Sequence, residues 1–201
     1  MPRGFSETER AMIRAKLLAA GRDSLATYGV RKTSVDDLVQ AVGISKGAFY
    51  AFFDTKEELF LTLFRQFEEE YRADLLRDSP GDPTQHAAWL RTFFQRAATH
   101  WRTNPLFRHF GEAEYTYLTR KFPAEAAQAM LDSDRAFVAD LLAHWDRAGL
   151  PLDCDADTFT GLMRGLFFMT LNAKSVGSAF PNVLTIIIDG IVLRLLPQHS
   201  S

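Results

Sequence analysis

Apolar residues recur at helical spacing along most of this 201-residue chain, and no segment shows the alternation of apolar and polar residues that is typical of a β-strand. In the first segment, Ile13 and Leu17 belong to one such apolar face. Ser6 can form a capping box with Glu9 at its start, and Gly29 provides a stop signal at its end. The pattern predicts one long first helix.

A second helix is predicted to begin at Ser34, which can form a capping box with Asp37, and to end at Gly43. A third segment of about two turns, Ser45–Tyr50, follows the turn. Helices under about 12 residues are marginal by themselves, so we expect Phe49 to hold this one by packing on its neighbours. The outer face of the short helix is then free.

A fourth helix is predicted from Thr55, which can form a capping box with Glu58, to about Leu76. Residues 77–85 are a polar break that contains Pro and Gly. Similar breaks predict later elements over about 83–104, from 104–105 onward, over about 124–149, over about 155–176 and over 181–196. The expected fold is all-α, with a small N-terminal three-helix domain over 1–55 and a larger helical domain over 56–201.

The segment "VGIS" at residues 42–45 fits the turn of a helix-turn-helix, in which two helices flank a short turn containing Gly. The second helix of this motif lies in the major groove and presents its N-terminal residues to base edges. Lys46 and Tyr50 lie four residues apart on the outer face, where they can contact phosphates or bases, while Gly47 and Ala48 leave little side chain between backbone and DNA. Ser45 stands at the start of the same helix.

Residues on either side of this helix are placed to bind phosphates. Thr33, Ser34 and Lys56 stand beside two helix starts, whose free N–H groups attract anions. Short helical corners are also common in all-helical enzymes, so the DNA-binding interpretation depends on the turn and both caps taken together.

Composition places the chain among globular proteins, with 47% apolar and 24% charged residues. The formal charge is −2, but it is unevenly distributed: residues 1–56 hold nine Lys or Arg and six Asp or Glu, net +3, and the remainder is −5. The positive end contains the helix-turn-helix pattern, although charge alone is equally compatible with chance clustering on a solvated surface.

The start of the chain lacks the uninterrupted apolar core of a signal peptide. The longest apolar run, Val183–Leu196, is shorter than the roughly 20 residues that a membrane span needs and contains two charged residues. The single cysteine, Cys154, cannot form an internal disulfide and lacks the paired spacing of a zinc site. We therefore expect a cytoplasmic protein with no membrane partner, cofactor or metal.

The segment "TSVDDLVQAVGISKGAFYAFFDTKEEL", residues 33–59, resembles the DNA-binding domain of the TetR family of transcriptional regulators, and the likeness covers about residues 10–60. The resemblance implies an all-helical homodimer. Residues 1–55 would then form the helix-turn-helix DNA-binding domain, and residues 56–201 the effector-binding and dimerisation domain. By the same resemblance, the positions that touch DNA are Thr33, Ser34, Lys46, Gly47, Tyr50 and Lys56. Two residues depart from the family pattern: Phe52 stands where many members carry His, and Ser24 where an apolar residue is usual.

Aromatic residues crowd the middle of the C-terminal part, and ligand cavities are mostly apolar with a few polar anchors. The same spacing is also typical of an ordinary core, so each residue has both interpretations. The candidates for the pocket are Trp89, Phe93, Trp101, Phe107, Phe110, Tyr115, Tyr117, Phe137, Met163, Phe167 and Asn172. His109 and Glu112 could share a helix face, where a surface hydrogen bond is the alternative to a ligand or metal site.

The last two predicted helices are apolar over a wider arc than a surface helix buries, which predicts a partner. Two such helices from each subunit can form a four-helix dimer interface, with glycines allowing close approach. The alternative is that they form the monomer's own core. The candidate interface residues are Phe159, Gly161, Gly165, Leu184, Ile187, Ile188, Ile191 and Leu195.

Together with the resemblance to the TetR family, these patterns predict a homodimeric repressor that binds a pseudo-palindromic operator and is released by a small, largely apolar or aromatic effector. An all-helical enzyme is a competing hypothesis, but the sequence has no G-x-S-x-G, no H-E-x-x-H and no phosphate-binding glycine loop. A helical ligand carrier or interaction module that no longer binds DNA is a second alternative. A steep salt dependence of DNA binding distinguishes the repressor from both.

Overall fold

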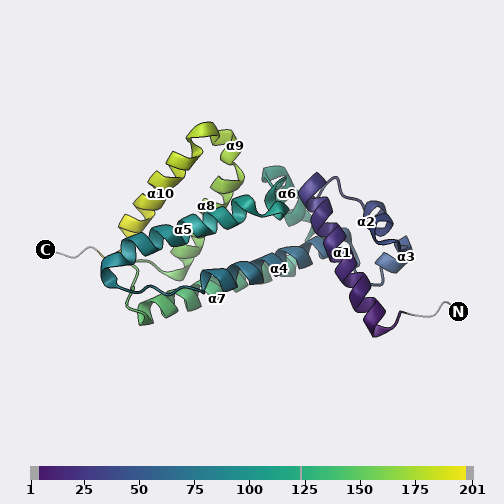
Figure 1. Ribbon diagram of the computed structural model, residues 1–201, viewed down its shortest axis with the longest axis horizontal. Helices are drawn as coiled ribbons and strands as arrows, with labels where there is room; N and C mark the ends of the chain where they lie inside the picture. The colour runs from purple at the N-terminus through teal and green to yellow at the C-terminus, as the bar shows by residue number, and fades with distance from the viewer. Residues whose placement is uncertain (1–4, 123, 198–201) are drawn as a thin grey trace. The chain divides into compact units, whose positions relative to one another are not determined.

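The computed structural model describes residues 5–122 and 124–197, and these residues form helices and no strand (Figure 1). The helical fold class is therefore confirmed. Packing divides the described residues into an N-terminal unit, residues 5–69 with 104–122, and a C-terminal unit, residues 70–103 with 124–197. The units do not follow the predicted boundary between residues 55 and 56, because the first part of the fourth helix and the later segment 104–122 both pack with the N-terminal helices.

The N-terminal unit begins with α1 (Glu7–Tyr28), α2 (Val35–Val42) and α3 (Lys46–Phe49). It also contains most of α4 (Lys56–Leu75), the 3₁₀ turn η2 (Pro105–Phe107) and α6 (Glu112–Lys121). Both predicted capping boxes are present, at Ser6 with Glu9 and at Ser34 with Asp37. The long first helix and the short second helix thus begin and end where their caps predict.

A close approach between α1 and α4 organises the core of this unit. Gly21 of α1 is buried, and a Cβ atom there would lie 2.3 Å from Cδ2 of Leu59. Leu17, Leu25 and Leu63 are also fully buried in this unit. In the same unit, the Phe107 ring packs against Phe67 with 4.9 Å between ring centroids. The segment after residue 104 is therefore part of the N-terminal core.

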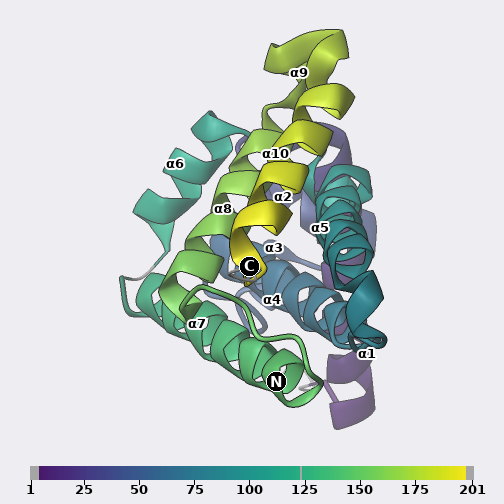
Figure 2. The same ribbon diagram turned by 90° about the vertical axis from the view of Figure 1, so that its left-hand side faces the viewer.

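The C-terminal unit contains η1 (Pro83–Gln85), α5 (His86–Thr103), α7 (Ala124–Arg147) and α8 (Ala156–Leu171). It ends with α9 (Ala173–Val176), the 3₁₀ turn η3 (Gly177–Ala179) and α10 (Phe180–Leu195), which faces the viewer in Figure 2. Helix α5 packs against α8 and α10, and α7 packs against α8. The predicted single helix over 155–176 is wrong in its last turn, because Asn172 ends α8 and a separate turn begins at Ala173.

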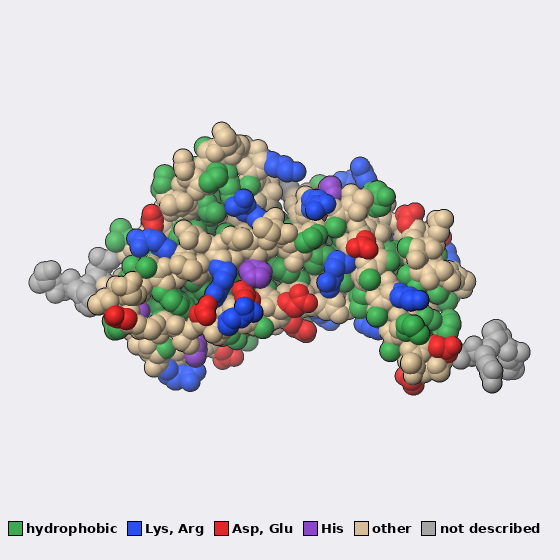
Figure 3. Space-filling view, viewed as in Figure 1, with side chains coloured by type: hydrophobic (Ala, Val, Ile, Leu, Met, Phe, Trp, Pro, Cys, Tyr) green, Lys and Arg blue, Asp and Glu red, His purple; other side chains and the backbone are tan. Residues whose placement is uncertain are grey.

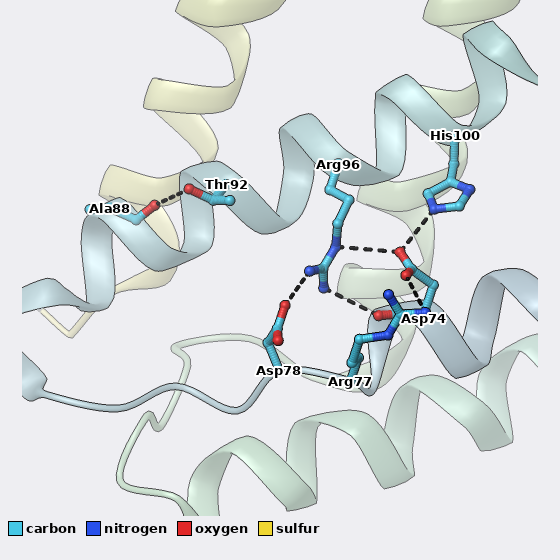
Figure 4. A network of polar contacts seen from close by, with 7 residues as sticks. All are labelled: Asp74, Arg77, Asp78, Ala88, Thr92, Arg96 and His100. Carbon is cyan, nitrogen blue, oxygen red and sulfur yellow. Dashed lines mark hydrogen bonds and ion pairs between the residues drawn. The ribbon is translucent and has the colours of Figure 1, made fainter.

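Charged groups attach the end of α4 to α5 within the C-terminal unit (Figure 4). The Asp74 carboxylate lies 2.8 Å from His100 Nε2 and 3.5 Å from Arg96 Nε. Arg96 also pairs with Asp78, in the loop after α4. On another part of α4, Arg72 donates to Ser133 Oγ and to Asp134 Oδ1 of α7, at 2.8 and 2.9 Å. These contacts hold the C-terminal end of α4 against two helices.

The segment Ala173–Leu195 is long and apolar enough to cross a membrane by length and composition. It is not one continuous α-helix, since Gly177 adopts a positive φ of 77° between α9 and α10. Helix α10 has 16 residues, which rise about 24 Å, less than the roughly 30 Å of a hydrocarbon core. Its exposed apolar residues therefore need an explanation other than a membrane span.

Candidate nucleic-acid interface

The turn between α2 and α3 is fixed by its backbone. Gly43 ends α2 in the left-handed conformation, with φ of 77° and ψ of 35°, and its N–H donates to the Val39 carbonyl at 2.9 Å. The Ile44 N–H donates to the same carbonyl at 3.1 Å. Residues other than glycine seldom adopt this backbone conformation, so Gly43 permits the sharp turn that separates the two helices.

Helix α3 is a single turn with one face packed on the protein core and the other face exposed. The Phe49 ring is 0% exposed and packs on Phe53 with ring centroids 5.9 Å apart. Ser45 Oγ accepts the Ala48 N–H at 3.1 Å, as its cap position predicts. The helix is shorter than the two predicted turns over Ser45–Tyr50, because after Phe49 the chain continues as hydrogen-bonded turns to Phe53.

The predicted outer face of α3 is exposed. Lys46, Gly47 and Tyr50 are accessible, with Tyr50 49% exposed, whereas Ala48 is half-buried. A Cβ added at Gly47 would meet only Ser45 Oγ, at 3.9 Å, so the backbone of α3 is open to an approaching molecule. The structure thus brings together a small exposed surface of the kind that reads a DNA groove.

An open hollow of about 470 Å³ lies beside this face, between the starts of α2 and α4. The residues that line it are Arg31, Lys32, Thr33, Ser34, Val35, Asp36, Lys46, Tyr50, Asp54, Thr55, Lys56 and Glu57. Two helix N-termini therefore border one hollow, and the N–H groups of helix starts favour anions. The basic pair Arg31 and Lys32 also lines the hollow and was not predicted from the sequence; its signal is two consecutive basic residues just before Thr33 and the Ser34 cap.

Both helix starts are secured by side-chain caps. Ser34 Oγ accepts the Asp37 N–H at 3.2 Å. The Ser34 hydroxyl and N–H donate to the Asp37 carboxylate at 2.6 and 3.1 Å, and these two hydrogen bonds lower the pKa of Asp37. At the start of α4, Thr55 Oγ1 accepts the Glu58 N–H at 3.1 Å. The Glu58 carboxylate accepts the Asp54 N–H at 2.7 Å, rather than that of the cap residue itself.

Two residues predicted to bind phosphates direct their polar atoms into the protein. The Thr33 side chain is buried, and its hydroxyl donates to the Gly29 carbonyl at 2.9 Å. The half-buried Lys56 ammonium donates to the carbonyls of Val30 and Thr33 at 3.1 and 2.7 Å, and burial lowers the pKa of Lys56. In this structure both side chains hold the loop between α1 and α2 in place and shape the hollow.

Charges of both signs line the hollow. Lys46 Nζ lies 3.0 Å from Asp36 Oδ2, and this hydrogen-bonded ion pair raises the pKa of Lys46. Acidic and basic side chains are likewise interspersed on the face seen in Figure 3. The hollow is therefore not a uniformly basic surface, and Asp36 is a residue of the interface that charge counting did not single out.

Phe52, the departure from the family pattern beside this surface, packs against α1. The Arg10 guanidinium lies 5.1 Å from the centroid of its ring and donates to the Ala51 carbonyl at 3.2 Å. The Phe5 ring lies 5.9 Å from the same ring. At this position an aromatic contact replaces the polar contact that His could make.

The predicted pocket residues are distributed over both packing units. Phe107, Phe110, Tyr115 and Tyr117 belong to the N-terminal unit, where Phe107 and Phe110 pack on Phe64 and the Tyr117 hydroxyl donates to the Glu57 carboxylate. Tyr115 is 41% exposed.

The other predicted pocket residues lie in the C-terminal unit. Phe93 and Trp101 are buried, and Phe93 meets Trp145 edge-on at 4.7 Å. Asn172 is exposed, and its side-chain amide donates to the Phe168 carbonyl. Half-buried side chains remain at Trp89, Phe137, Met163 and Phe167.

Of the two anchors considered for a ligand or metal, His109 is exposed. The side chain of Glu112 lies outside the described residues. Within the described part of the chain, no group of three or more His, Cys, Asp or Glu side chains gathers closely enough to hold a metal ion.

Several predicted interface residues belong instead to the monomer's core. Phe159 is fully buried against Phe94, and Ile188 and Leu195 are also buried. Gly161 and Gly165 are exposed, Ile187 is 37% exposed, Ile191 is half-buried and Leu184 is buried. The predicted apolar stripe of α10 is thus largely its inner face.

The exposed apolar residues of these helices form two other stripes, defined by positions i, i+4 and i+7. They are Gly161, Gly165 and Phe168 on α8, and Ile186, Gly190 and Leu193 on α10. Ile186 and Leu193 are 70% and 68% exposed, and a Cβ at Gly161, Gly165 or Gly190 would meet nothing within 4 Å. These stripes are exposed on the single chain.

A glycine turn, an exposed short helix and two capped helix starts around one hollow define a helix-turn-helix protein of the DNA-binding class. The family model described as "Bacterial regulatory proteins, tetR family" matches residues 17–63, which contain all of these features. Residues 17–63 therefore match the N-terminal domain of the tetR family of bacterial regulatory proteins.

Curated relatives of this chain are named as HTH-type transcriptional regulators. The chain is 33% identical over 112 residues to the HTH-type transcriptional repressor AcnR of Corynebacterium diphtheriae, covering 52% of this chain and 58% of that protein. It is 29% identical over 89 residues to the HTH-type transcriptional regulator EthR of Mycobacterium tuberculosis, covering 42% and 41%. The chain therefore spans about half the length of the curated relatives it matches. These relatives are named as transcriptional regulators and not as enzymes.

The fold likeness extends further along the chain than the sequence likeness. A TetR-family transcriptional regulator from Pectobacterium atrosepticum superimposes with a TM-score of 0.65 over 96% of this chain and 99% of that one, at 20% identity. At this identity the match shows the fold, which includes the helices of the C-terminal unit.

Proposed function

We propose that this protein is a transcriptional regulator, most simply a repressor, that binds a pseudo-palindromic operator as a homodimer and leaves it when a small molecule binds. The observation that carries the proposal is the exposed face of α3 beside a hollow bordered by two helix starts. The match of its N-terminal domain to the tetR family model and its named relatives support a regulatory role in the cytoplasm.

The DNA-binding residues of the proposal fall into two groups. Lys46 of α3 and Tyr50, which caps its C-terminal end, are the exposed side chains proposed to contact DNA. The backbone of Ser45, Gly47 and Ala48 would lie close to the bases. Ser34, Arg31 and Lys32 border the hollow, where the helix starts can receive a phosphate. Thr33 and Lys56 support this second group by fixing the loop before α2.

Dimerisation would proceed through α8 and α10. Their exposed stripes combine glycines with open space above them and large apolar side chains, which suits close packing against a second copy. A single one-turn helix contacts few bases, and a twofold dimer places two such helices about one helical turn of DNA, or a multiple of it, apart.

The effector would be small and largely apolar or aromatic. The half-buried Trp89, Phe137, Met163 and Phe167 of the C-terminal unit are the side chains proposed to contact it. Binding must favour a conformation in which the two α3 helices no longer fit the operator, because a ligand with equal affinity for both states shifts nothing. Quenching of Trp89 or Trp101 fluorescence would report its entry.

Selection of bound sequences from a random duplex pool, at roughly physiological salt, tests the proposal. We expect a pseudo-palindrome to be enriched. Lys46→Ala and Tyr50→Ala should each abolish enrichment while the protein stays dimeric by light scattering. Absence of any enrichment with folded, dimeric wild-type protein would contradict DNA recognition, and operator binding by both variants would contradict the assignment of residues.

A further inference from the structure

Asp36 and Lys46 form an ion pair between α2 and α3 on the surface proposed to meet DNA. Lys46 Nζ and Asp36 Oδ2 are 3.0 Å apart. The Lys46 side chain is 52% exposed, the Asp36 side chain is 70% exposed, and both residues line the hollow. Exposed ion pairs contribute little to folding stability. The capping box of α2 is made by Asp37, so Asp36 is not needed for that cap.

The pair has different consequences for contacts with phosphates and with bases. If Lys46 contacts a phosphate, whether or not it keeps its bond to Asp36, the Asp36 carboxylate is brought close to a second negative charge. An ammonium group has three N–H donors, and the guanine O6 and N7 atoms in the major groove are uncharged acceptors. Lys46 can therefore donate to a base edge while it keeps its bond to Asp36.

We propose that Asp36 is a specificity-determining residue, which holds Lys46 in its ion pair and thereby weakens binding to DNA on which Lys46 faces phosphates rather than a guanine edge. The inference rests on the proposed function, since it concerns how the same surface distinguishes an operator from other DNA. An acidic side chain would thus increase selectivity by repelling DNA other than the operator.

The test compares wild type, Asp36→Asn, Lys46→Ala and the double variant on operator and scrambled duplexes across a salt series. Asp36→Asn should raise affinity for scrambled DNA about fivefold and change operator affinity less than about twofold. It should also steepen the salt slope on scrambled DNA by about 0.9, because Lys46 is then free to neutralise one more phosphate. In the Lys46→Ala background, the substitution at Asp36 should have little effect.

Asp54→Asn is the matched control, because Asp54 lines the same hollow and the variant changes the net charge equally. Thermal melts establish that each variant is folded. The inference is overturned if Asp36→Asn leaves the ratio of operator to scrambled affinity unchanged, if Asp54→Asn has the same effect, or if the effect persists without Lys46. Wild-type protein that prefers no sequence would instead overturn the proposed function, and the inference with it.

Discussion

Tyr117 links α6 to the start of α4 within the N-terminal unit. Its hydroxyl donates to the Glu57 carboxylate, and the Lys56 ammonium lies 5.7 Å from the centre of its ring. Burial, followed by the hydrogen bond to Glu57, raises the pKa of Tyr117 to about 12. The residue predicted to contact an effector thus supports the helix start that borders the hollow.

Tyr117→Phe should lower the free energy of unfolding by about 1 kcal/mol at neutral pH, because it removes this hydrogen bond. The unfolded phenol ionises near pH 10, so the folded state favours the protonated form. The stabilisation is therefore complete below pH 10 and is lost as the pH rises from 10 towards about 12. Urea denaturation of both proteins from pH 7 to 11 measures this difference.

Tyr28→Phe is the control, since Tyr28 is 60% exposed, and it should change stability by less than about 0.5 kcal/mol. A Tyr117→Phe protein as stable as wild type at pH 7 would show that the hydrogen bond contributes nothing.

At the scale of the element, α3 illustrates how a helix too short to be stable alone is made rigid. It is one turn long, and the buried Phe49 ring attaches it to the core while Tyr50 points away. Stability and recognition are therefore carried by adjacent residues of the same turn.

Phe49→Ala should lower the free energy of unfolding by about 3–5 kcal/mol, because it leaves a cavity under α3. Tyr50→Ala should change stability by less than about 0.5 kcal/mol and still lose operator binding. Chemical denaturation and a DNA-binding titration on the same preparations separate the two effects. A strongly destabilised Tyr50→Ala protein would mean that its ring supports the fold.

At the scale of the whole molecule, the exposed stripes of α8 and α10 are expected to join two chains. The combined substitution Ile186→Glu and Leu193→Glu should convert a dimer, of twice the 22.7 kDa chain mass, into a monomer. The monomer should bind the operator far more weakly, because two half-sites can no longer be contacted together.

Leu131→Glu, at a 39% exposed position on α7, is the control and should remain dimeric. Sedimentation velocity measures the mass of each protein. A double variant that sediments as wild type would place the dimer contact elsewhere.

The sequence alone determined those features that depend on neighbours along the chain. The capping boxes at Ser6 and Ser34 and the stop at Gly43 involve residues only three or four positions apart, so their physical signal is local and the structure confirms them. The exposed face of α3 follows from the same local pattern, since Phe49 had to be inward for the short helix to exist.

Tertiary structure decided what depends on residues far apart in sequence. Lys56 turns inward because two carbonyls of the loop after α1 accept hydrogen bonds from its ammonium group. Segment 104–122 joins the N-terminal core because its aromatic rings pack on α4. Helix α10 is apolar on nearly every side, so its sequence could not show which stripe is buried; the contact with α5 buries Ile188 and leaves Ile186 exposed. Periodicity locates a face of a helix, but only the neighbouring elements determine whether that face is covered.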